Sequence, residues 1–440
     1  MNPSRIISLD GWWTGQKLNR PGEVWPGRVT GLERNSRVCL LCRGGRNLCG
    51  KLRCPVIARL EALAGLNGLV DGELVEGSTP PAVFVGRIGY PKVSIGPMIP
   101  PYYGNTEILD TPEQWMGRSI DDIIRFRMSL IRGKSRSHIL QAREPSGLLE
   151  TLQELAMGEK PTETEAAFTK KPRKVLVLSD EAQPFGPTAP LKRFKTAQVS
   201  VDRRIERTYY DRDLRASEAI ASLYMSGVPV TRIQRSFSLG MFGVSARRRL
   251  VPTRWAITAV DSTLSLRLLT EIKQFPTIDE YLVYSFKNIG NSYAAVLLPE
   301  KWSFEWIEAW FPRTFWNPSG SNPELMGDFE PYDGRTTYAS VGGCYYSARL
   351  ALAERLRSER RQASGLLMRE IHPDYILPVG VWNVRESLRA MLKTCPARFD
   401  NFEEALSRAL KTMTVPVQRW AGSSRIIREA RSQRKLTEHI

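Results

Sequence analysis

The apolar positions in the first third of the chain occur in short runs that glycine and proline interrupt. Residues 83–85 and 93–95 are two such runs, and glycines and a proline separate them. Runs of this kind are typical of two short strands that meet at a tight turn. Earlier in the chain, Pro55 opens a helically spaced apolar pattern and Gly65 follows it. This pattern predicts a short helix.

A second helix is expected after Ser119. This serine stands three residues before Asp122, which is the spacing of a capping box at a helix start. The apolar spacing of a helix then continues to about residue 131. The sequence therefore predicts an amphipathic helix over about residues 120–131.

Two further helical segments stand close together in the middle of the chain. Residues 213–225 and 230–237 both have helical spacing, and Gly227 separates them. Such a pair resembles a helix-turn-helix, whose second helix reads the major groove of DNA and would here present Arg232 and Arg235. An ordinary helical hairpin with a solvated basic edge is the commoner arrangement. Both interpretations stay open.

Strand patterns dominate the region that follows. Residues 254–260, 281–286 and 293–298 predict three strands, and a hairpin-like loop joins the last two. Asp261 stands at the end of the first strand. Residues 302–316 are rich in tryptophan and phenylalanine. We interpret them as a helix in the core in preference to a platform for bases, because such helices are more often buried.

A long basic helix is predicted after two glycines near residue 342. Gly342 and Gly343 precede the helical spacing, which extends to about residue 363. A glycine turn that enters a helix can bind phosphate at the helix N-terminus. A lone pair of glycines is a weak signal for that role, and a simple turn is the alternative.

Four of the six cysteines cluster early in the chain, and their spacing is that of metal ligands. The first pair has C-x-x-C spacing and four residues separate the second pair, so four thiolates can surround the tetrahedral Zn²⁺ ion. Neighbouring basic residues favour the thiolate form. Four protein ligands leave no position for water, so the site is structural. The predicted ligands are Cys39, Cys42, Cys49 and Cys54.

Two alternatives to zinc use the same cysteines. An iron–sulfur cluster also takes four thiolates in a compact loop. A disulfide pair is a further alternative, although disulfides belong mainly to secreted proteins. Charged residues interrupt the first thirty positions, and no apolar run approaches the ~20 residues of a membrane-spanning helix. We therefore expect a cytoplasmic, nucleoid-associated protein without membrane contact.

Basic residues outnumber acidic ones by a margin that indicates a polyanionic partner. The 440 residues include 63 Lys and Arg against 46 Asp and Glu, a net charge of +17. Residues 1–60 alone hold eleven basic residues against three acidic ones, so the cysteine module is also basic. The predicted DNA-binding residues are Arg43, Arg46, Lys51, Arg53, Arg247, Arg248 and Arg249.

Carboxylates are the only side chains here that favour catalysis. The chain has three histidines, His138, His372 and His439, which gives little support for a histidine triad or a catalytic zinc. Several acids could converge at a strand edge, as a two-metal nuclease requires, although each alone is more often a cap or a salt-bridge partner. The candidates are Asp261, Glu305, Asp328 and Glu370.

Long strings along the whole chain resemble the archaeal Nre (NreA-type) DNA repair proteins. Besides the cysteine cluster they are FVGRIGYPKV at 84–93, GPMIPP at 96–101, DTPEQW at 110–115, LVPTRWAITAVD at 250–261, GRTTYA at 334–339 and PVGVWNVRE at 378–386. The resemblance implies a role in DNA-damage repair, a four-cysteine zinc finger and a C-terminal motif that binds the sliding clamp PCNA. It implies no set of catalytic residues.

The C-terminal end fits the start of the clamp-binding pattern Q-x-x-L. Gln433 and Leu436 occupy its first two positions, and His439 and Ile440 stand where the pattern has aromatic residues. In this pattern the aliphatic and aromatic side chains together form a hydrophobic plug. The plug is smaller than usual in this chain, and weaker clamp binding is expected. A frayed basic tail is the alternative.

Together these patterns predict an α/β or α+β protein, with a mixed sheet, surrounding helices and an N-terminal four-cysteine zinc module. We expect a repair factor that binds DNA, PCNA and other repair proteins, or alternatively a metal-dependent nuclease or hydrolase that acts on damaged DNA. The expected regions are 1–65 (basic arm and zinc module), 66–165 (mixed α/β region), 166–205 (linker or extended crossing segment, with one strand at 175–178), 206–424 (C-terminal α/β domain with the helical hairpin) and 425–440 (basic tail with the clamp motif).

Overall fold

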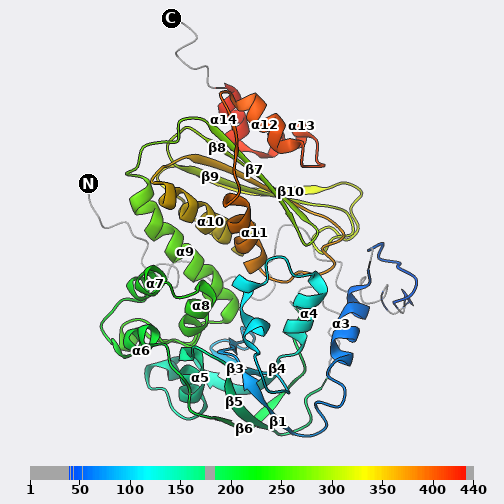
Figure 1. Ribbon diagram of the computed structural model, residues 1–440, viewed down its shortest axis with the longest axis vertical. Helices are drawn as coiled ribbons and strands as arrows, with labels where there is room; N and C mark the ends of the chain where they lie inside the picture. Colours follow the sequence, from blue (N-terminus) through cyan, green and yellow to red (C-terminus); the bar gives the residue numbers. More distant parts are fainter. Residues whose placement is uncertain (1–38, 40, 43, 52, 174–183, 433–440) are drawn as a thin grey trace, which may run out of the picture.

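Two six-stranded mixed sheets, each accompanied by helices, form the described part of the chain (Figure 1). The computed structural model describes residues 39, 41–42, 44–51, 53–173 and 184–432. The predicted basic arm before Cys39 and the predicted strand at 175–178 lie outside these residues. The architecture is a mixed α+β fold, which agrees with the predicted class. Every helix in the described ranges is too short or too polar to cross a bilayer.

The first sheet has the strand order β1-β5-β6-β4-β3-β2. Its neighbours are antiparallel except β4 and β6, which run parallel. The two short strands predicted around residues 83–95 are confirmed as the antiparallel pair β2 and β3. The strands are β1 (Leu74–Thr79), β2 (Val83–Val85), β3 (Lys92–Ile99), β4 (Ile131–His138), β5 (Thr162–Phe168) and β6 (Thr188–Thr196).

The predicted linker over 166–205 contains a strand in the middle of this sheet. Strand β6 pairs with β5 on one side and with β4 on the other. Proline is tolerated here because the register puts Pro190 opposite Lys134, where the pairing of β4 and β6 ends. The extended crossing segment is therefore the better description of residues 188–196.

Helices from the first half of the chain surround the first sheet and reach toward the second. The helix predicted from Pro55 is confirmed as α3. The helix after Ser119 is confirmed as α4, and Ser119 and Asp122 form the predicted capping box. The helices are α3 (Pro55–Ala64), α4 (Ile120–Met128), α5 (Leu148–Met157), α6 (Arg203–Tyr210), α7 (Ala216–Met225) and α8 (Val230–Ser238). Short 3-10 helices lie at Glu107–Asp110 (η1), Pro112–Gln114 (η2), Ile139–Arg143 (η3) and Ser245–Arg247 (η4).

The second sheet has the strand order β10-β9-β11-β8-β7-β12, and only β9 and β11 are parallel neighbours. The predicted hairpin is confirmed as β7 and β8. Ile289 and Gly290 both have positive φ, which a two-residue type I′ turn requires. The strands are β7 (Tyr281–Asn288), β8 (Asn291–Leu298), β9 (Ser303–Trp310), β10 (Glu324–Glu330), β11 (Ser364–Ile371) and β12 (Ala397–Phe399).

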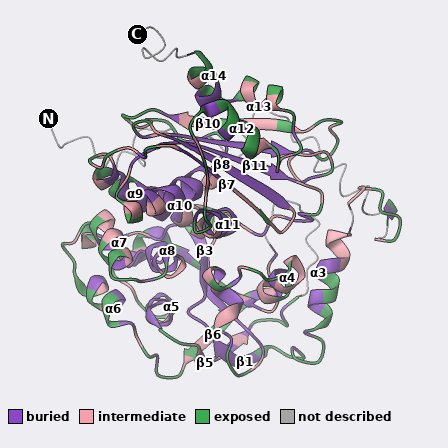
Figure 2. Ribbon diagram, turned by 45° about the horizontal axis from the view of Figure 1, so that its top comes forward, coloured by how far each residue is buried: buried purple, intermediate pink, exposed green. Residues whose placement is uncertain are grey.

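Helices cover both faces of the second sheet, so its central strands β8, β9 and β11 are buried on both sides (Figure 2). One face packs against α9 (Thr253–Ile272), α10 (Gly343–Glu359) and α11 (Trp382–Leu392), and this core continues to the first sheet. The other face packs against α12 (Phe402–Leu410), α13 (Val417–Ser423) and α14 (Arg425–Ser432), which form a second core with it. The predicted long helix after Gly342 is confirmed as α10.

The strand predicted over residues 254–260 is wrong, because these residues begin α9. Isoleucine, threonine and valine in this segment favour a strand locally. The buried positions repeat every four residues along the helix, at Ala256, Val260, Leu264, Leu268 and Ile272. One face of a helix can thus be buried over five turns, and that tertiary packing overrides the local preference.

The helix predicted within residues 302–316 is also wrong, because residues 303–310 form β9. The segment is nevertheless core, as predicted. Trp302 and Trp306 are fully buried, and the strand is buried on both faces. A strand covered on both sides has no alternation of apolar and polar residues, so its pattern cannot be distinguished from that of a buried helix.

Candidate functional site

The four predicted catalytic carboxylates lie in different places. Asp261 is in the middle of α9, whereas Glu305 and Glu370 lie on the face of the second sheet that α12–α14 cover. Asp328 lies on β10 and contacts the segment that precedes α10. Among the described residues, no three Asp, Glu, His or Cys side chains gather as a metal site.

Glu305 and Glu370 both accept hydrogen bonds from backbone amides. Glu305 accepts from the Ser424 hydroxyl at 2.6 Å and from the amides of Arg425 and Ile426 at 2.7 and 3.0 Å, at the start of α14. Burial raises the pKa of Glu305. Glu370 accepts from the amides of Thr414 and Val415 at 2.8 and 2.7 Å. Both carboxylates therefore fix the C-terminal helices onto the sheet.

Asp328 has a similar structural role. It accepts a hydrogen bond from the Val341 amide at 2.9 Å and pairs with Arg335 at 2.9 Å. Since all four carboxylates are engaged and lie on separate elements, the hypothesis of a carboxylate-based nuclease loses its geometric basis. Convergence of the acids, which the sequence left open, does not occur in the described structure.

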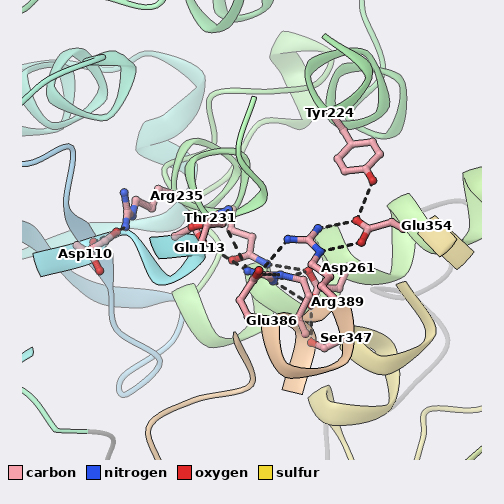
Figure 3. A network of polar contacts seen from close by, with 12 residues as sticks. Asp110, Glu113, Tyr224, Thr231, Arg235, Asp261, Ser347, Glu354, Glu386 and Arg389 are labelled. Atoms are coloured by element: carbon pink, nitrogen blue, oxygen red, sulfur yellow. Dashed lines mark hydrogen bonds and ion pairs between the residues drawn. The ribbon is translucent and has the colours of Figure 1, made fainter. Parts of the chain in front are cut away.

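Asp261 is instead the centre of a buried ionic network (Figure 3). Its carboxylate is fully buried, and Arg385 Nη1 of α11 donates to both of its oxygens at 3.1 and 3.3 Å. Gln234 of α8 and Ser347 of α10 also donate to it, at 2.8 and 2.5 Å. Burial raises the pKa of Asp261 and Arg385 opposes that shift. Four helices thus meet at one carboxylate.

The network extends from Arg385 toward the outside of the helices. Glu386 accepts from Arg385 at 3.0 Å and from Arg389 at 2.9 Å. Arg389 also forms two hydrogen bonds to Glu354 of α10, which in turn accepts from the Tyr224 hydroxyl of α7 at 2.7 Å. The network joins helices α7 to α11, and its buried position makes it a structural junction rather than a substrate site.

The predicted second helix of a helix-turn-helix is part of this interior. Arg232 of α8 pairs with Asp202 at 3.0 Å, and Arg235 pairs with Asp110 at 2.6 Å. Residues 233–238 are all buried. The helical hairpin is observed, but its second helix cannot enter a DNA groove. The DNA-reading interpretation is therefore wrong.

The predicted phosphate turn before α10 is explained by packing. A Cβ atom at Gly343 would lie 3.1 Å from Val381 Cγ1 and 3.2 Å from Thr258 Oγ1. Glycine is needed here because α10 lies close to its neighbours, and the contacts give no support to a phosphate site.

Backbone amides surround one of the four cysteines of the loop. Cys42 is buried, and hydrogen bonds from the amides of Leu48, Arg46, Gly44 and Asn47 lower the pKa of its thiol. Gly44 has a φ of 76°, and a Cβ there would lie 2.9 Å from Ile57 Cδ1. Cys42, Cys49 and Cys54 form no disulfide bond, which gives no support to the disulfide alternative.

The structure does not bring three of the four cysteines to metal-binding distance. Four cysteine thiols, and the amides at Cys42, suit a thiolate-bound metal. The sulfur atoms, however, are not placed around one common point. Zinc and the iron–sulfur alternative therefore both stay predictions.

Several predicted DNA-binding residues make contacts within the protein. Arg248 is buried and donates to the carbonyls of Gly243, Tyr209 and Asp211 at 2.8–2.9 Å, so it is not available to DNA. Lys51 donates to the Ile376 carbonyl at 3.1 Å. Arg53 pairs with Asp121 and Glu61.

The remaining predicted DNA-binding residues differ in accessibility. Arg46 and Arg247 are exposed, Arg249 is half-buried, and Arg43 lies outside the described residues.

A group of basic side chains on the first sheet was not predicted from the sequence. Strand β4 has the sequence IRGKSRSH, in which Arg132, Lys134 and Arg136 share one face. Alternation of basic and small residues over this strand was the available signal.

Comparison with known proteins assigns this two-sheet α+β chain to a family. It belongs to the archaeal Nre family, because the models described as Archaeal Nre, N-terminal and Archaeal Nre, C-terminal match residues 48–317 and 330–439. The family resemblance inferred from the sequence is confirmed. No solved structure matches the chain.

The relatives that match most of this chain are named as DNA repair proteins. DNA repair protein NreB of Archaeoglobus fulgidus is 44% identical over 403 residues, which are 91% of this chain and 100% of the relative. DNA repair protein NreA of the same organism is 36% identical over 84% of this chain and 92% of the relative. DNA repair protein NreA of Haloferax volcanii is 36% identical over 77% and 82%, respectively.

Proposed function

We propose that this protein is a DNA repair factor that binds DNA and docks on the sliding clamp PCNA through its C-terminal residues. The observation that carries the repair role is that three relatives named as DNA repair proteins match 77–91% of this chain. In this proposal the protein is a binding factor, because the described carboxylates serve the fold.

The distribution of charge supports a polyanionic partner. Inside the described structure, buried carboxylates pair with buried arginines, as Asp261 does with Arg385, Glu330 with Arg349 and Glu308 with Arg369. These pairs contribute no net charge. The surplus of +17 is therefore carried by residues outside these pairs, and such a surplus can attract DNA phosphates.

DNA binding is expected to weaken steeply with salt. Each neutralised phosphate releases counterions, so a plot of log Ka against log salt concentration should fall by about 0.9 per contact on duplex DNA. Fluorescence anisotropy of a labelled duplex, titrated at several salt concentrations, measures this slope. A binding constant that stays the same between low and moderate salt would argue against a phosphate-dominated interface.

Clamp docking is proposed for residues 433–440, which lie outside the described residues. Helix α14 ends at Ser432, and Arg425, Arg428 and Arg431 are exposed on it. A basic flank can raise the rate of association with an acidic surface. Gln433 and Leu436 are proposed to enter the clamp, with His439 and Ile440 as the smaller remainder of the plug.

Leu436→Ala is expected to weaken clamp binding about tenfold or more, because it removes an aliphatic anchor from a hydrophobic pocket. The matched control is Thr437→Ala, a neighbour outside the pattern, which should change binding by less than about threefold. Surface plasmon resonance with immobilised clamp provides the measurement. Equal effects of the two substitutions, or full binding after deletion of 433–440, would refute the assignment.

A structural metal is the third part of the proposal. Cys39, Cys42, Cys49 and Cys54 would hold it as thiolates, and a zinc ion bound by four cysteines supplies folding energy and no chemistry. The amides that surround Cys42 support this assignment, because they stabilise its thiolate form.

A further inference from the structure

One face of β4 is an exposed row of basic side chains. Ile131, Gly133 and Ser137 point to the buried side of the first sheet, whereas Lys134 and Arg136 are exposed on the other side. Neighbouring strands extend the row, because paired residues in a sheet point to the same face. In the strand register, Lys92 of β3 lies opposite His138 of β4, and Lys134 lies opposite Pro190 of β6.

Strand β6 supplies two more cations on that face. In the strand register Arg193 lies opposite Ala167 and Lys195 lies opposite Glu165. Leu191 and Phe194 pack into the core on the opposite side, because the register shifts between Arg193 and Leu191. We call this group the basic face. It consists of Lys92, Lys134, Arg136, Arg193 and Lys195, all of which are exposed.

Most of these cations have no acidic partner. Within the described residues, Lys92, Lys134 and Lys195 form no ion pair, and Arg193 is paired with Glu165 at 2.6 Å. Arg136 donates to the carbonyls of Lys92 and Ile88 at 2.9 and 3.2 Å. These bonds fix its side chain without neutralising its charge.

A second group of arginines lies beside the basic face and adds to its positive potential. Arg127 and Arg235 both pair with Asp110, each at 2.6 Å. Arg132, the residue of β4 that precedes Lys134 on the same face, lies over the rings of Phe185 and Phe84 at 4.5 and 5.4 Å. Burial and the nearby charge of Arg127 lower the pKa of Arg132 to about 10. Two guanidinium groups thus share one carboxylate, and the third lies near them without an ion pair of its own among the described residues.

Acidic residues occupy the other end of the same face of the sheet. Glu76 of β1 lies opposite Glu165 of β5 in the strand register, and the charges of Glu76, Glu163 and Glu165 act together on the exposed Tyr103. The face is thus divided into an acidic half over β1 and β5 and a basic half over β3, β4 and β6. A polyanion would be attracted to the basic half and repelled from the other, which defines where it can lie.

We propose that the basic face binds the sugar–phosphate backbone of DNA. This inference rests on the proposed DNA-binding function and names the surface that performs it. The members of the face are lysines and arginines without an aromatic platform, so the contacts are with phosphates and do not depend on base sequence. The surface differs from the residues predicted from the sequence, several of which make internal contacts.

A triple charge reversal tests the proposal on the full-length protein. The variant Lys92→Glu/Lys134→Glu/Lys195→Glu should bind a labelled duplex about tenfold or more weakly than wild type, and its salt slope should be smaller by about 0.9 for each lost contact. The matched control Lys287→Glu/Lys301→Glu/Lys411→Glu reverses three exposed lysines elsewhere and has the same net charge. It should bind within about threefold of wild type.

The outcomes separate this inference from the proposed function. Wild-type affinity in the basic-face variant, or an equal loss in both variants, would overturn the assignment of this surface while leaving DNA binding intact. A wild-type protein that binds no duplex at low salt would overturn the proposed function and this surface with it. Melting curves establish that both variants are folded. If the glutamate variant melts early, the Lys→Gln triple at the same positions replaces it, with an expected loss of about fivefold.

Discussion

Replacing Arg385 by methionine is expected to destabilise the protein by about 3–5 kcal/mol, because it removes one partner of a buried ion pair. Asp261 has no exposed surface and receives two hydrogen bonds from Arg385. Without the guanidinium, the carboxylate is left buried without a cation. Chemical denaturation followed by tryptophan fluorescence measures the loss.

Two further variants make this result specific. Arg419 is an exposed arginine of α13, and Arg419→Met should change stability by less than about 0.5 kcal/mol. The double variant Asp261→Leu/Arg385→Met should recover part of the loss, since a buried pair can be replaced by apolar residues. An Arg385→Met protein as stable as Arg419→Met would show that the network does not hold helices α7 to α11 together.

Loss of the proposed metal is expected to have the second large effect. Native protein should contain one zinc ion or one iron–sulfur cluster per chain, and Cys42→Ser should lose most of it, because metal affinity at such sites depends on every thiolate. Elemental analysis of both proteins gives the metal content. Their melting curves should differ, since metal binding energy is folding energy at such sites.

Cys395 provides the matched control, because it is exposed and lies far along the chain from the loop. Cys395→Ser should keep the full metal content and the melting temperature of the wild type. Native protein without zinc or iron, or Cys42→Ser protein with unchanged metal, would end the assignment.

Local signals in the sequence predicted those parts of the fold that local interactions determine. The capping box at Ser119, the proline at the start of α3 and the turn between β7 and β8 each lie within a few residues of the element they define. Such features act through bonds between near neighbours. They were therefore visible without knowledge of the rest of the structure.

Features that depend on distant partners were not predictable in this way. The segment 303–310 is a strand because β10 and β11 pair with it on both sides. Arg235 appeared to be a DNA-reading residue, yet its partner Asp110 stands 125 residues earlier. The same holds for Asp261, Glu305 and Glu370, since the distant amides and side chains that engage them give no signal near each acid.

The most direct test of the central claim uses purified protein with labelled duplexes, damaged and undamaged, scored together for binding and for metal-dependent products. A DNA-binding repair factor should bind the duplexes in a salt-sensitive way, bind the damaged ones more tightly, and leave both uncleaved when Mg²⁺ or Mn²⁺ is added. Absence of binding at low salt, or metal-dependent cleavage of the damaged duplex, would contradict this account.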